Sequence, residues 1–497
     1  MTELPTPSFE TPPAEILERL AALRRDDAPT HGGHVLSYVY DSGLAELDEL
    51  AASAIRAMQP VNGLDPTTFG SVAVMEREVV SFTRALLNGD DSVVGSVTTG
   101  GTESCLLAVK TARDNWRNAG GEGMPRLLAP VSVHAAFQKA AHYFGLGLDL
   151  VPVDVVTGIV DADRLIERLG DDVALVVVSA PSYPHAALDP VAAVAAACAE
   201  RQIDCHVDAC IGGLVLPFWE GLEPWDFRVA GVTSMSADLH KFGYAPKGVS
   251  VLLQRGRDRQ RTQYFATTRW PGYPVVNPTM LGSKSAGPLA ASWAILHALG
   301  LAGFAELAAS CARSTRSLIQ VIEGIRGLRV VGTPVGPLLA IATDEGAPEH
   351  DRVDPHHWAD QVRQHGWLLQ LQPALTQTDG SRLPRTTHLT ITPVTEGVLA
   401  DLSVALVTAA DQVRGIPGIT AEDALGSLPA DAAAALGAAA GPIDSEASYA
   451  MLVAIGLGGG GALPNRMAPF LALIEALPPQ LSERLLTELI ARLVEPR

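Results

Sequence analysis

The stretch VALVVVSAP, residues 173–181, is an uninterrupted apolar run that ends in small and turn-forming residues. Helix-like segments separate it from most of six further short apolar runs, which lie at 94–99, 126–132, 148–154, 203–209, 232–237 and 248–254. Strands that are apolar along their whole length are typical of a parallel sheet that helices cover on both faces. The sequence therefore predicts an α/β fold with a mostly parallel, seven-stranded sheet.

The rest of the chain predicts further domains around this sheet. A long helical tract is expected from about 287 to 327, and two more strands at 338–343 and 388–393 indicate a smaller α/β domain. The last 80 or so residues are rich in Ala, Gly and Leu and show no recognisable chemistry. We expect four regions: an N-terminal arm and helix (1–60), a large cofactor-binding domain (61–310), a small C-terminal domain (311–415) and a helical C-terminal extension (416–497).

Composition and charge exclude several classes of protein. The net charge of −19 argues against a nucleic-acid partner, because a phosphate backbone is bound by clustered Lys and Arg. No run reaches the roughly 20 apolar residues of a membrane-spanning helix. The N-terminus has neither the basic start nor the apolar core of a signal peptide. The five cysteines, an odd number in apolar surroundings, indicate reduced thiols. We therefore expect a cytoplasmic protein without a membrane span.

Three polar clusters follow predicted strands, at the edge of the sheet where functional groups gather in α/β proteins. The first is TTGGTES, residues 98–104, which stands between a strand and a helix-like segment. Its glycines allow a sharp turn, and the N–H groups at the start of the helix can bind a phosphate. A purely structural turn explains this cluster equally well when it is considered alone.

The second cluster is HVDAC, residues 206–210, in which Asp208 ends a buried strand. A carboxylate there is costly unless it has a cationic partner, and a protonated pyridine nitrogen is such a partner. The alternative is an Asp that caps the next loop.

The third cluster, SADLHKFG at 236–243, contains Lys241 beside His240. Apolar and aromatic neighbours are expected to lower the pKa of the amine, as Schiff-base chemistry requires, whereas an isolated Lys–His pair is usually a surface feature.

Together the clusters have the order and spacing of one site for pyridoxal 5'-phosphate (PLP): a phosphate loop, a carboxylate for the ring nitrogen and a Schiff-base lysine. His134 follows the run at 126–132 and is expected to stack on the ring, although a structural histidine is the alternative. The pairs His31/His34 and His356/His357 have no second ligand cluster at metal spacing, so no metal is expected.

Five segments closely resemble the sphingosine-1-phosphate lyase branch of the PLP-dependent (group II) decarboxylase superfamily. They are TTGGTES, SVHAAFQKAAHYFG, SAPSYPHAALDP, HVDACIGGLVLPF and SADLHKFGYAPKG, and the likeness extends from about residue 30 to about 410. The resemblance implies the fold-type I architecture of PLP-dependent transferases. It also implies a cytoplasmic homodimer whose active sites are built from both subunits. The membrane anchor of eukaryotic members has no counterpart in this sequence, as expected of a soluble form.

The resemblance also implies roles for individual residues. Lys241 would form the Schiff base with PLP, Asp208 beside Ala209 would pair with the pyridine nitrogen, and His134 would stack on the ring. The residues expected near the cofactor phosphate are Gly101, Thr102 and His240, with Gly282 and Ser283 reaching it from the other subunit. Tyr40 and Lys247 match residues that the family uses around the phosphate of the substrate.

One position departs from the family pattern. Where the family usually has a histidine before a proline, this chain has Asp65, in the segment NGLDP at 62–66. A carboxylate 4 Å from a substrate phosphate would be repelled by about 4 kcal/mol at an effective dielectric near 20. Either Asp65 is protonated, or its loop is displaced, or the substrate is not a phosphorylated sphingoid base and Asp65 receives a cationic or hydroxylated group.

The implied reaction is retro-aldol cleavage of a phosphorylated long-chain amino alcohol, a small-molecule amine, to an aldehyde and ethanolamine phosphate. A base must take the proton of the β-hydroxyl, and Lys241, His240 and Tyr40 are the candidates. The main alternative is α-decarboxylation of an amino acid with the same cofactor. A non-catalytic PLP-binding scaffold is a third interpretation, and the complete set Asp208, His240 and Lys241 argues against it.

Overall fold

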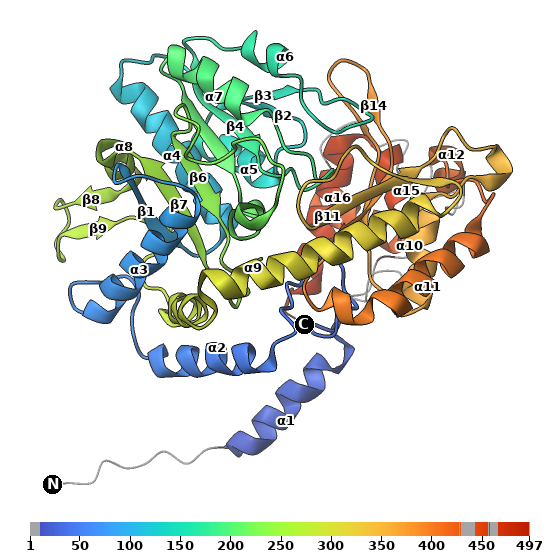
Figure 1. Ribbon diagram of the computed structural model, residues 1–497, viewed down its shortest axis with the longest axis horizontal. Coiled ribbons are helices and arrows are strands. Elements are labelled where there is room, and N and C mark those ends of the chain that lie inside the picture. Colours follow the sequence, from blue (N-terminus) through green and yellow to red (C-terminus); the bar gives the residue numbers. More distant parts are fainter. Residues whose placement is uncertain (1–9, 427, 429–442, 456, 458–465, 497) are drawn as a thin grey trace.

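The computed structural model describes residues 10–426, 428, 443–455, 457 and 466–496. A large domain surrounds a seven-stranded sheet, and a smaller domain lies beside it with the C-terminal helices packed against it (Figure 1). The long helix α9 (Gly287–Glu323) runs from the first domain into the second. The N-terminal helix α1 (Pro13–Leu23) projects from the body of the molecule and buries none of its residues.

The sheet of the large domain has the strand order β1-β7-β6-β5-β4-β2-β3. Its strands are β1 (Val93–Thr98), β2 (Arg126–Pro130), β3 (Gly147–Val151), β4 (Val173–Ser179), β5 (Asp204–Asp208), β6 (Ser234–Ala237) and β7 (Ser250–Arg255). Only β7 is antiparallel to its neighbours, β1 and β6. Each predicted apolar run corresponds to one strand, so the mostly parallel seven-stranded sheet is confirmed. The runs extend past the strands because the turns that follow are also built from small and apolar residues.

Both faces of this sheet are buried, as the apolar strands predicted. In β4, Val176 and Val178 belong to one core, whereas Leu175 and Val177 belong to a second core on the opposite face. The helices of this domain are α2 (Ala45–Met58), α3 (Gly70–Leu86), α4 (Gly101–Asn118), α5 (Ala135–Phe144), α6 (Ala162–Ile166), α7 (Val191–Glu200) and α8 (Arg257–Gln263). A short hairpin, β8 (Phe265–Thr267) with β9 (Val275–Asn277), projects from its edge.

The helix α9 contributes to two cores. Ile295 packs in the core of the large domain, while Leu318 and Ile322 pack in that of the small domain, and the backbone departs from helical geometry at Gly300. By length and composition α9 is the one described helix that could cross a membrane, a test that core helices also pass.

The small domain adds β10 (Leu328–Val330), β11 (Leu338–Thr343), β12 (Gln370–Gln372), β15 (Thr386–Thr390), α10 (Pro355–Gln364) and α11 (Thr395–Val413).

The C-terminal extension forms a core of its own and is anchored to the small domain. Its helices are α12 (Ala421–Gly426), α14 (Ser445–Ala454), α15 (Ala468–Ala476) and α16 (Pro479–Leu493). Asp360 of α10 accepts hydrogen bonds from the backbone N–H groups of Met467 (2.7 Å) and Ala468 (2.9 Å), at the start of α15. Glu475 of α15, 5% exposed, pairs with Arg385 at 2.9 Å. A hairpin of β13 (Leu375–Thr376) and β14 (Arg382–Leu383) lies beside this contact.

Candidate active site

A cavity of about 800 Å³ lies where several strands of the large sheet end. Residues of all three polar clusters line it, including Gly101, Asp208 and Lys241, together with His134 from the start of α5. The structure therefore brings together the side chains that the sequence assigned to one site. The carboxyl ends of parallel strands position them, as in other open α/β sheets.

Lys241 lies in the turn that follows β6, and its Nζ is 2.9 Å from Oδ2 of Asp238. The side chain of Asp238 is 1% exposed and that of Lys241 is 20% exposed. Burial lowers the pKa of the Lys241 amine, but the charge of Asp238 and its hydrogen bond outweigh it, so that this pKa lies well above 10.5. The expectation of a lowered pKa is thus wrong for the chain without cofactor, because apolar neighbours were weighed without the carboxylate three residues before.

Asp208 ends β5 and is buried against the cavity. Its Oδ1 accepts hydrogen bonds from the N–H of Cys210 (3.1 Å) and the hydroxyl of Ser236 (3.4 Å), and among the described residues it has no ion-pair partner. A buried carboxylate that faces a cavity without a cation of its own fits the protonated nitrogen of a pyridine ring. Ala209, expected beside the ring, is fully buried and does not line the cavity.

The predicted phosphate loop lies at the N-terminus of α4, where Gly101 and Thr102 line the cavity. The first N–H groups of a helix have no partner within it and favour an anion. A Cβ at Gly101 would lie 2.5 Å from Oδ2 of Asp238, so glycine is required at this position. Glu103 fixes the loop from behind, since its Oε2 accepts from the N–H (2.5 Å) and the hydroxyl (2.7 Å) of Thr99.

The two predicted cofactor histidines both line the cavity and differ in their bonding. His134 is the N-cap of α5, and its Nδ1 accepts from the N–H of Ala136 at 3.2 Å. Nδ1 of His240 accepts from the N–H of Val249 at 3.3 Å, while its Nε2 lies 3.6 Å from Asp238. Burial lowers the pKa of His240, so the neutral ring carries its proton on Nε2. His240 is therefore a donor at Nε2, and Nδ1 is not free to take a proton.

Tyr40 and Lys247 also line the cavity, and they contact each other. The ammonium of Lys247 lies 4.6 Å from the ring centroid of Tyr40, and it donates to the carbonyl of His240 at 3.2 Å. Burial, with the nearby charge of Lys241, lowers the pKa of Lys247 to about 8. Burial raises the pKa of Tyr40 to about 12, so its phenol keeps its proton at neutral pH. Lys247 thus adds a cation to the cavity beside Lys241, as the resemblance implied, and Lys139 of α5 also lines the cavity.

Besides Ala209, three predicted residues lie outside the lining of the cavity within one chain. Asp65, expected on the substrate side, turns instead to the hydroxyls of Thr67 and Thr68, each 2.6 Å away. These bonds hold its pKa well below the usual range, so a protonated Asp65 is excluded and no repulsion arises in this cavity. Gly282 and Ser283 also lie outside it, although the preceding Met280 and Leu281 are part of the wall.

Among the residues of the site that sequence reasoning missed, three make contacts that hold it together. Asp238 pairs with Lys241, and its position three residues before that lysine was the available signal. Glu103 joins the phosphate loop to the opposite rim, because its Oε1 accepts from the N–H of Met280 at 2.5 Å. Tyr183 lines the cavity and stacks on His388 of the small domain, with ring centroids 4.1 Å apart. Nothing local in the sequence indicates this contact between domains.

The residues of the cavity fit PLP in each of its parts. The unpaired carboxylate of Asp208 suits the ring nitrogen, the start of α4 suits the phosphate, and the amine of Lys241 suits the aldehyde. When bound, PLP withdraws electrons from the α-carbon of an attached amine. The arrangement is therefore suited to breaking a bond at that carbon.

Comparison with known proteins agrees with this geometry. A model of the pyridoxal-dependent decarboxylase conserved domain matches residues 61–326, and a model of the C-terminal HTH domain of pyridoxal-dependent enzymes matches 421–492. Sphingosine-1-phosphate lyase of Dictyostelium discoideum is 35% identical over 69% of this chain and 66% of its own length. The lyase of Oryza sativa subsp. japonica is 33% identical, over 84% of this chain and 76% of its own.

A solved structure of sphingosine-1-phosphate lyase from Burkholderia pseudomallei has a TM-score of 0.75 and 33% sequence identity, covering 83% of this chain and 93% of that one. The chain belongs to the pyridoxal-dependent decarboxylase family and, within it, to the branch of the sphingosine-1-phosphate lyases; its cofactor is PLP. The alignments span about two thirds of the length of the Dictyostelium and rat relatives, 66% in each case.

Proposed function

We propose that this chain is a PLP-dependent carbon–carbon lyase that cleaves a phosphorylated long-chain amino alcohol to an aldehyde and a phosphorylated amine. The observation that carries the proposal is a second, partly desolvated cation, Lys247, in the same cavity as Lys241. The two cations allow one end of the substrate to be attached at the cofactor and its phosphate to be held separately. The sphingosine-1-phosphate lyases among the relatives support the same substrate class.

The walls of the cavity support a substrate with both a charged and an apolar part. Lys247 and the hydroxyl of Tyr40 face the cavity on one side and suit a phosphate. Leu106, Met280 and Leu281 add apolar surface, and the last two are about half exposed at the rim. An alkyl chain that leaves the cavity across this rim is removed from water without the need for a closed tunnel.

The bonding of the side chains selects the base for the β-hydroxyl proton. Nδ1 of His240 already accepts a backbone N–H, and the phenol of Tyr40 is protonated at neutral pH. Both therefore act as hydrogen-bond donors. Lys241 differs, because its Nζ would be bonded to PLP and would be set free without a proton when the substrate amine replaces it. Nζ would then take the hydroxyl proton, with Asp238 at 2.9 Å to stabilise the resulting ammonium.

The proposal includes a cytoplasmic homodimer. Gly282 and Ser283 lie on a loop next to the cavity of their own chain without lining it, which suits a contribution to the site of a partner. The exposed apolar side chains of α1, such as Leu17 (66% exposed) and Leu23 (71% exposed), suit coverage by a second subunit. The five cysteines are all buried and unpaired, which suits a reducing compartment.

The test is a product assay on purified, PLP-loaded protein. Sphingosine 1-phosphate and, separately, a panel of amino acids are offered while aldehyde and carbon dioxide are both monitored. We expect aldehyde from the phosphorylated amino alcohol, none from Lys241→Ala, and a raised KM in Lys247→Met. The unphosphorylated amino alcohol is the matched control substrate and should react poorly.

Carbon dioxide from an amino acid, with no aldehyde from the amino alcohol, would replace the proposal by the decarboxylase alternative. A PLP absorbance band that depends on Lys241 but responds to no amine would instead favour the scaffold. The dimer is tested independently by size-exclusion chromatography with light scattering. A monomer that binds PLP normally would contradict a role of Gly282 and Ser283 across subunits.

A further inference from the structure

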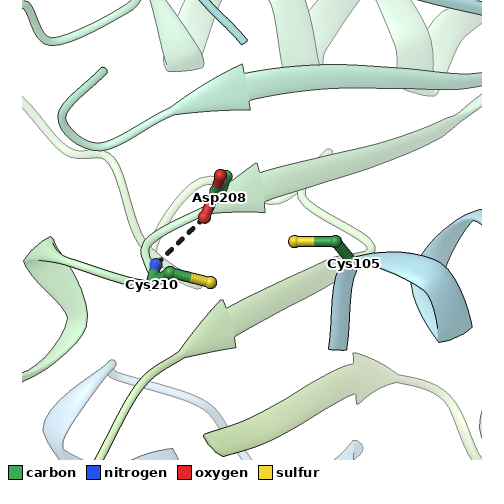
Figure 2. Close-up of side chains that lie close together, drawn as sticks. All are labelled: Cys105, Asp208 and Cys210. Atoms are coloured by element: carbon green, nitrogen blue, oxygen red, sulfur yellow. Dashed lines mark hydrogen bonds between the residues drawn. The ribbon is translucent and has the colours of Figure 1, made fainter. Parts of the chain in front are cut away.

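Two thiols and a carboxylate meet in the wall of the cavity. Cys105 lies in the first turns of α4, Asp208 ends β5, and Cys210 follows two residues later. One donor atom from each, the two Sγ atoms and a carboxylate oxygen, lie within 4.8 Å of one another, and all three residues are buried. Figure 2 shows the thiols of Cys105 and Cys210 extending toward each other beside Asp208. This juxtaposition comes from elements that are distant in the sequence, so the spacing of ligands along the chain did not reveal it.

This set of donors is one that zinc binds. Zn²⁺ takes thiolate at about 2.3 Å and carboxylate at about 2.0–2.2 Å, usually in a tetrahedron, so its donors lie roughly 3.3–3.8 Å apart. Donors within 4.8 Å need a contraction of only about 1 Å to reach this geometry. Part of the cluster is already fixed, because the hydroxyl of Ser236 contacts both the thiol of Cys210 (3.2 Å) and Asp208 (3.4 Å). The cavity gives room for water as a fourth ligand.

We propose that the cofactor-free chain binds one Zn²⁺ through Cys105 Sγ, Cys210 Sγ and a carboxylate oxygen of Asp208, and that zinc and PLP exclude each other. The exclusion follows because Asp208 is also the partner expected for the ring nitrogen of PLP, and because all three ligands line the cavity that PLP enters. The sequence had predicted no metal, since it was searched for histidine pairs and for repeated ligand spacings.

The charges around the cluster are consistent with this site. Two thiolates and one carboxylate give the zinc complex a net charge of −1, and the ammonium of Lys241 lies near enough to interact with Cys105 and Cys210. Zinc takes cysteine as the thiolate, so its binding to two thiols would release two protons.

The consequence is that zinc controls the loading of the cofactor. Because the two ligands compete, the apparent dissociation constant of PLP rises in proportion to the zinc concentration, by about tenfold when zinc is at about ten times its own dissociation constant. Zinc binding to the chain without cofactor does not depend on which reaction the enzyme catalyses. An active lyase can therefore lack the zinc site, and a chain that binds zinc can lack lyase activity.

The experiment compares the full-length chain stripped of PLP with the PLP-loaded chain. Each is dialysed against zinc chloride under reducing conditions, and bound metal and released protons are measured. We expect one zinc and two released protons per stripped chain, little zinc on the loaded chain, and loss of the metal when PLP is added. Cobalt(II) in place of zinc should give a thiolate-to-metal charge-transfer band.

The matched variants are Cys105→Ala and Cys311→Ala. Mutation of a residue that only supports a metal ligand lowers the affinity for the metal by about 10- to 100-fold. Loss of the ligand Cys105 itself should therefore lower the affinity for zinc by more than about 100-fold. Cys311 is equally buried but does not line the cavity, and its variant should bind zinc as the wild type does. Far-UV circular dichroism and thermal unfolding of both variants show that they are folded.

Three results would overturn the proposal. Equal zinc binding by stripped and loaded chains, or by Cys105→Ala and the wild type, would place the metal elsewhere. The loss of two titratable thiols without bound metal would show a disulfide between Cys105 and Cys210 instead of a metal site.

Discussion

Replacing Asp238 by Asn should destabilise the cofactor-free protein by about 3–4 kcal/mol. The substitution keeps the shape of the side chain but leaves the ammonium of Lys241, 2.9 Å away, without its buried partner. Breaking a buried ion pair from one side costs about 3–5 kcal/mol. Lys241 can instead release its proton, which at pH 7.4 costs about 4 kcal/mol for an amine with an unperturbed pKa of about 10.4. Because Lys241 can lose its proton at this cost, the loss of folding free energy should not exceed about 4 kcal/mol.

The dependence on pH gives this prediction a second readout. In the wild type the pKa of Asp238 is lowered and that of Lys241 is raised, so the stability from the pair is complete between about pH 4 and pH 10.5. It is lost as the pH falls through the folded pKa of Asp238 or rises through that of Lys241. In Asp238→Asn, burial lowers the pKa of Lys241 in the folded chain below its value in the unfolded chain. Between pH 7 and 9.5 the unfolded chain therefore binds more protons than the folded chain, and the free energy of unfolding rises with pH.

Urea unfolding followed by tryptophan fluorescence, at fixed protein concentration and at pH 7 and 9.5, measures both effects. Asp172→Asn is the control, because its pair with Arg126 (2.6 Å) is about half exposed at the carboxylate and should be worth less than about 1 kcal/mol. A loss at Asp238 as small as that of the control, or a stability that does not rise with pH, would refute the reasoning.

Three further predictions follow from single contacts. Gly101→Ala should weaken PLP binding at least tenfold in a titration followed by absorbance, since its Cβ would lie 2.5 Å from Asp238; unchanged affinity would contradict this crowding. Binding of a phosphorylated amino alcohol should weaken as the pH rises through about 8, the pKa of Lys247, and this step should vanish in Lys247→Met. Glu475→Gln should loosen the C-terminal helices by about 2–4 kcal/mol through its pair with Arg385, measured by hydrogen exchange in α15 and α16, while exchange in the large sheet stays the same.

The sheet could be predicted from the sequence because each strand carries its own signal. A run such as 173–179 is apolar on both faces, and this pattern needs no knowledge of its neighbours. The three polar clusters were predictable for the same reason, since the carboxyl ends of strands meet at one edge of the sheet. The match of residues 421–492 to the C-terminal HTH domain of pyridoxal-dependent enzymes was not, because the described helices of this extension are specified by their mutual packing rather than by a local motif.

Polar contacts that the apolar pattern of the sequence does not show account for the differences at the site. The pKa of Lys241 was predicted from its apolar neighbours in the sequence, whereas the charge of Asp238 sets it in space. Within one chain, two threonine hydroxyls within three residues bind Asp65 in its own turn, and its place on the substrate side of a site shared between subunits stays a prediction. The cluster of Cys105 with Asp208 and Cys210 joins two elements 103 residues apart, a distance at which one sequence gives no signal.

Glu103 accepts hydrogen bonds from Thr99, on the phosphate loop, and from Met280, 177 residues later on the rim of the cavity. The carboxylate of Glu103 thus sets the distance between the phosphate loop, which would hold the cofactor, and the rim at Met280, over which an alkyl chain would leave. Insertions or deletions between 277 and 283 would shift the N–H of Met280 and strain the phosphate loop as well. Variation in the chain length of accepted substrates should therefore arise from side-chain exchanges on this rim rather than from changes in its length.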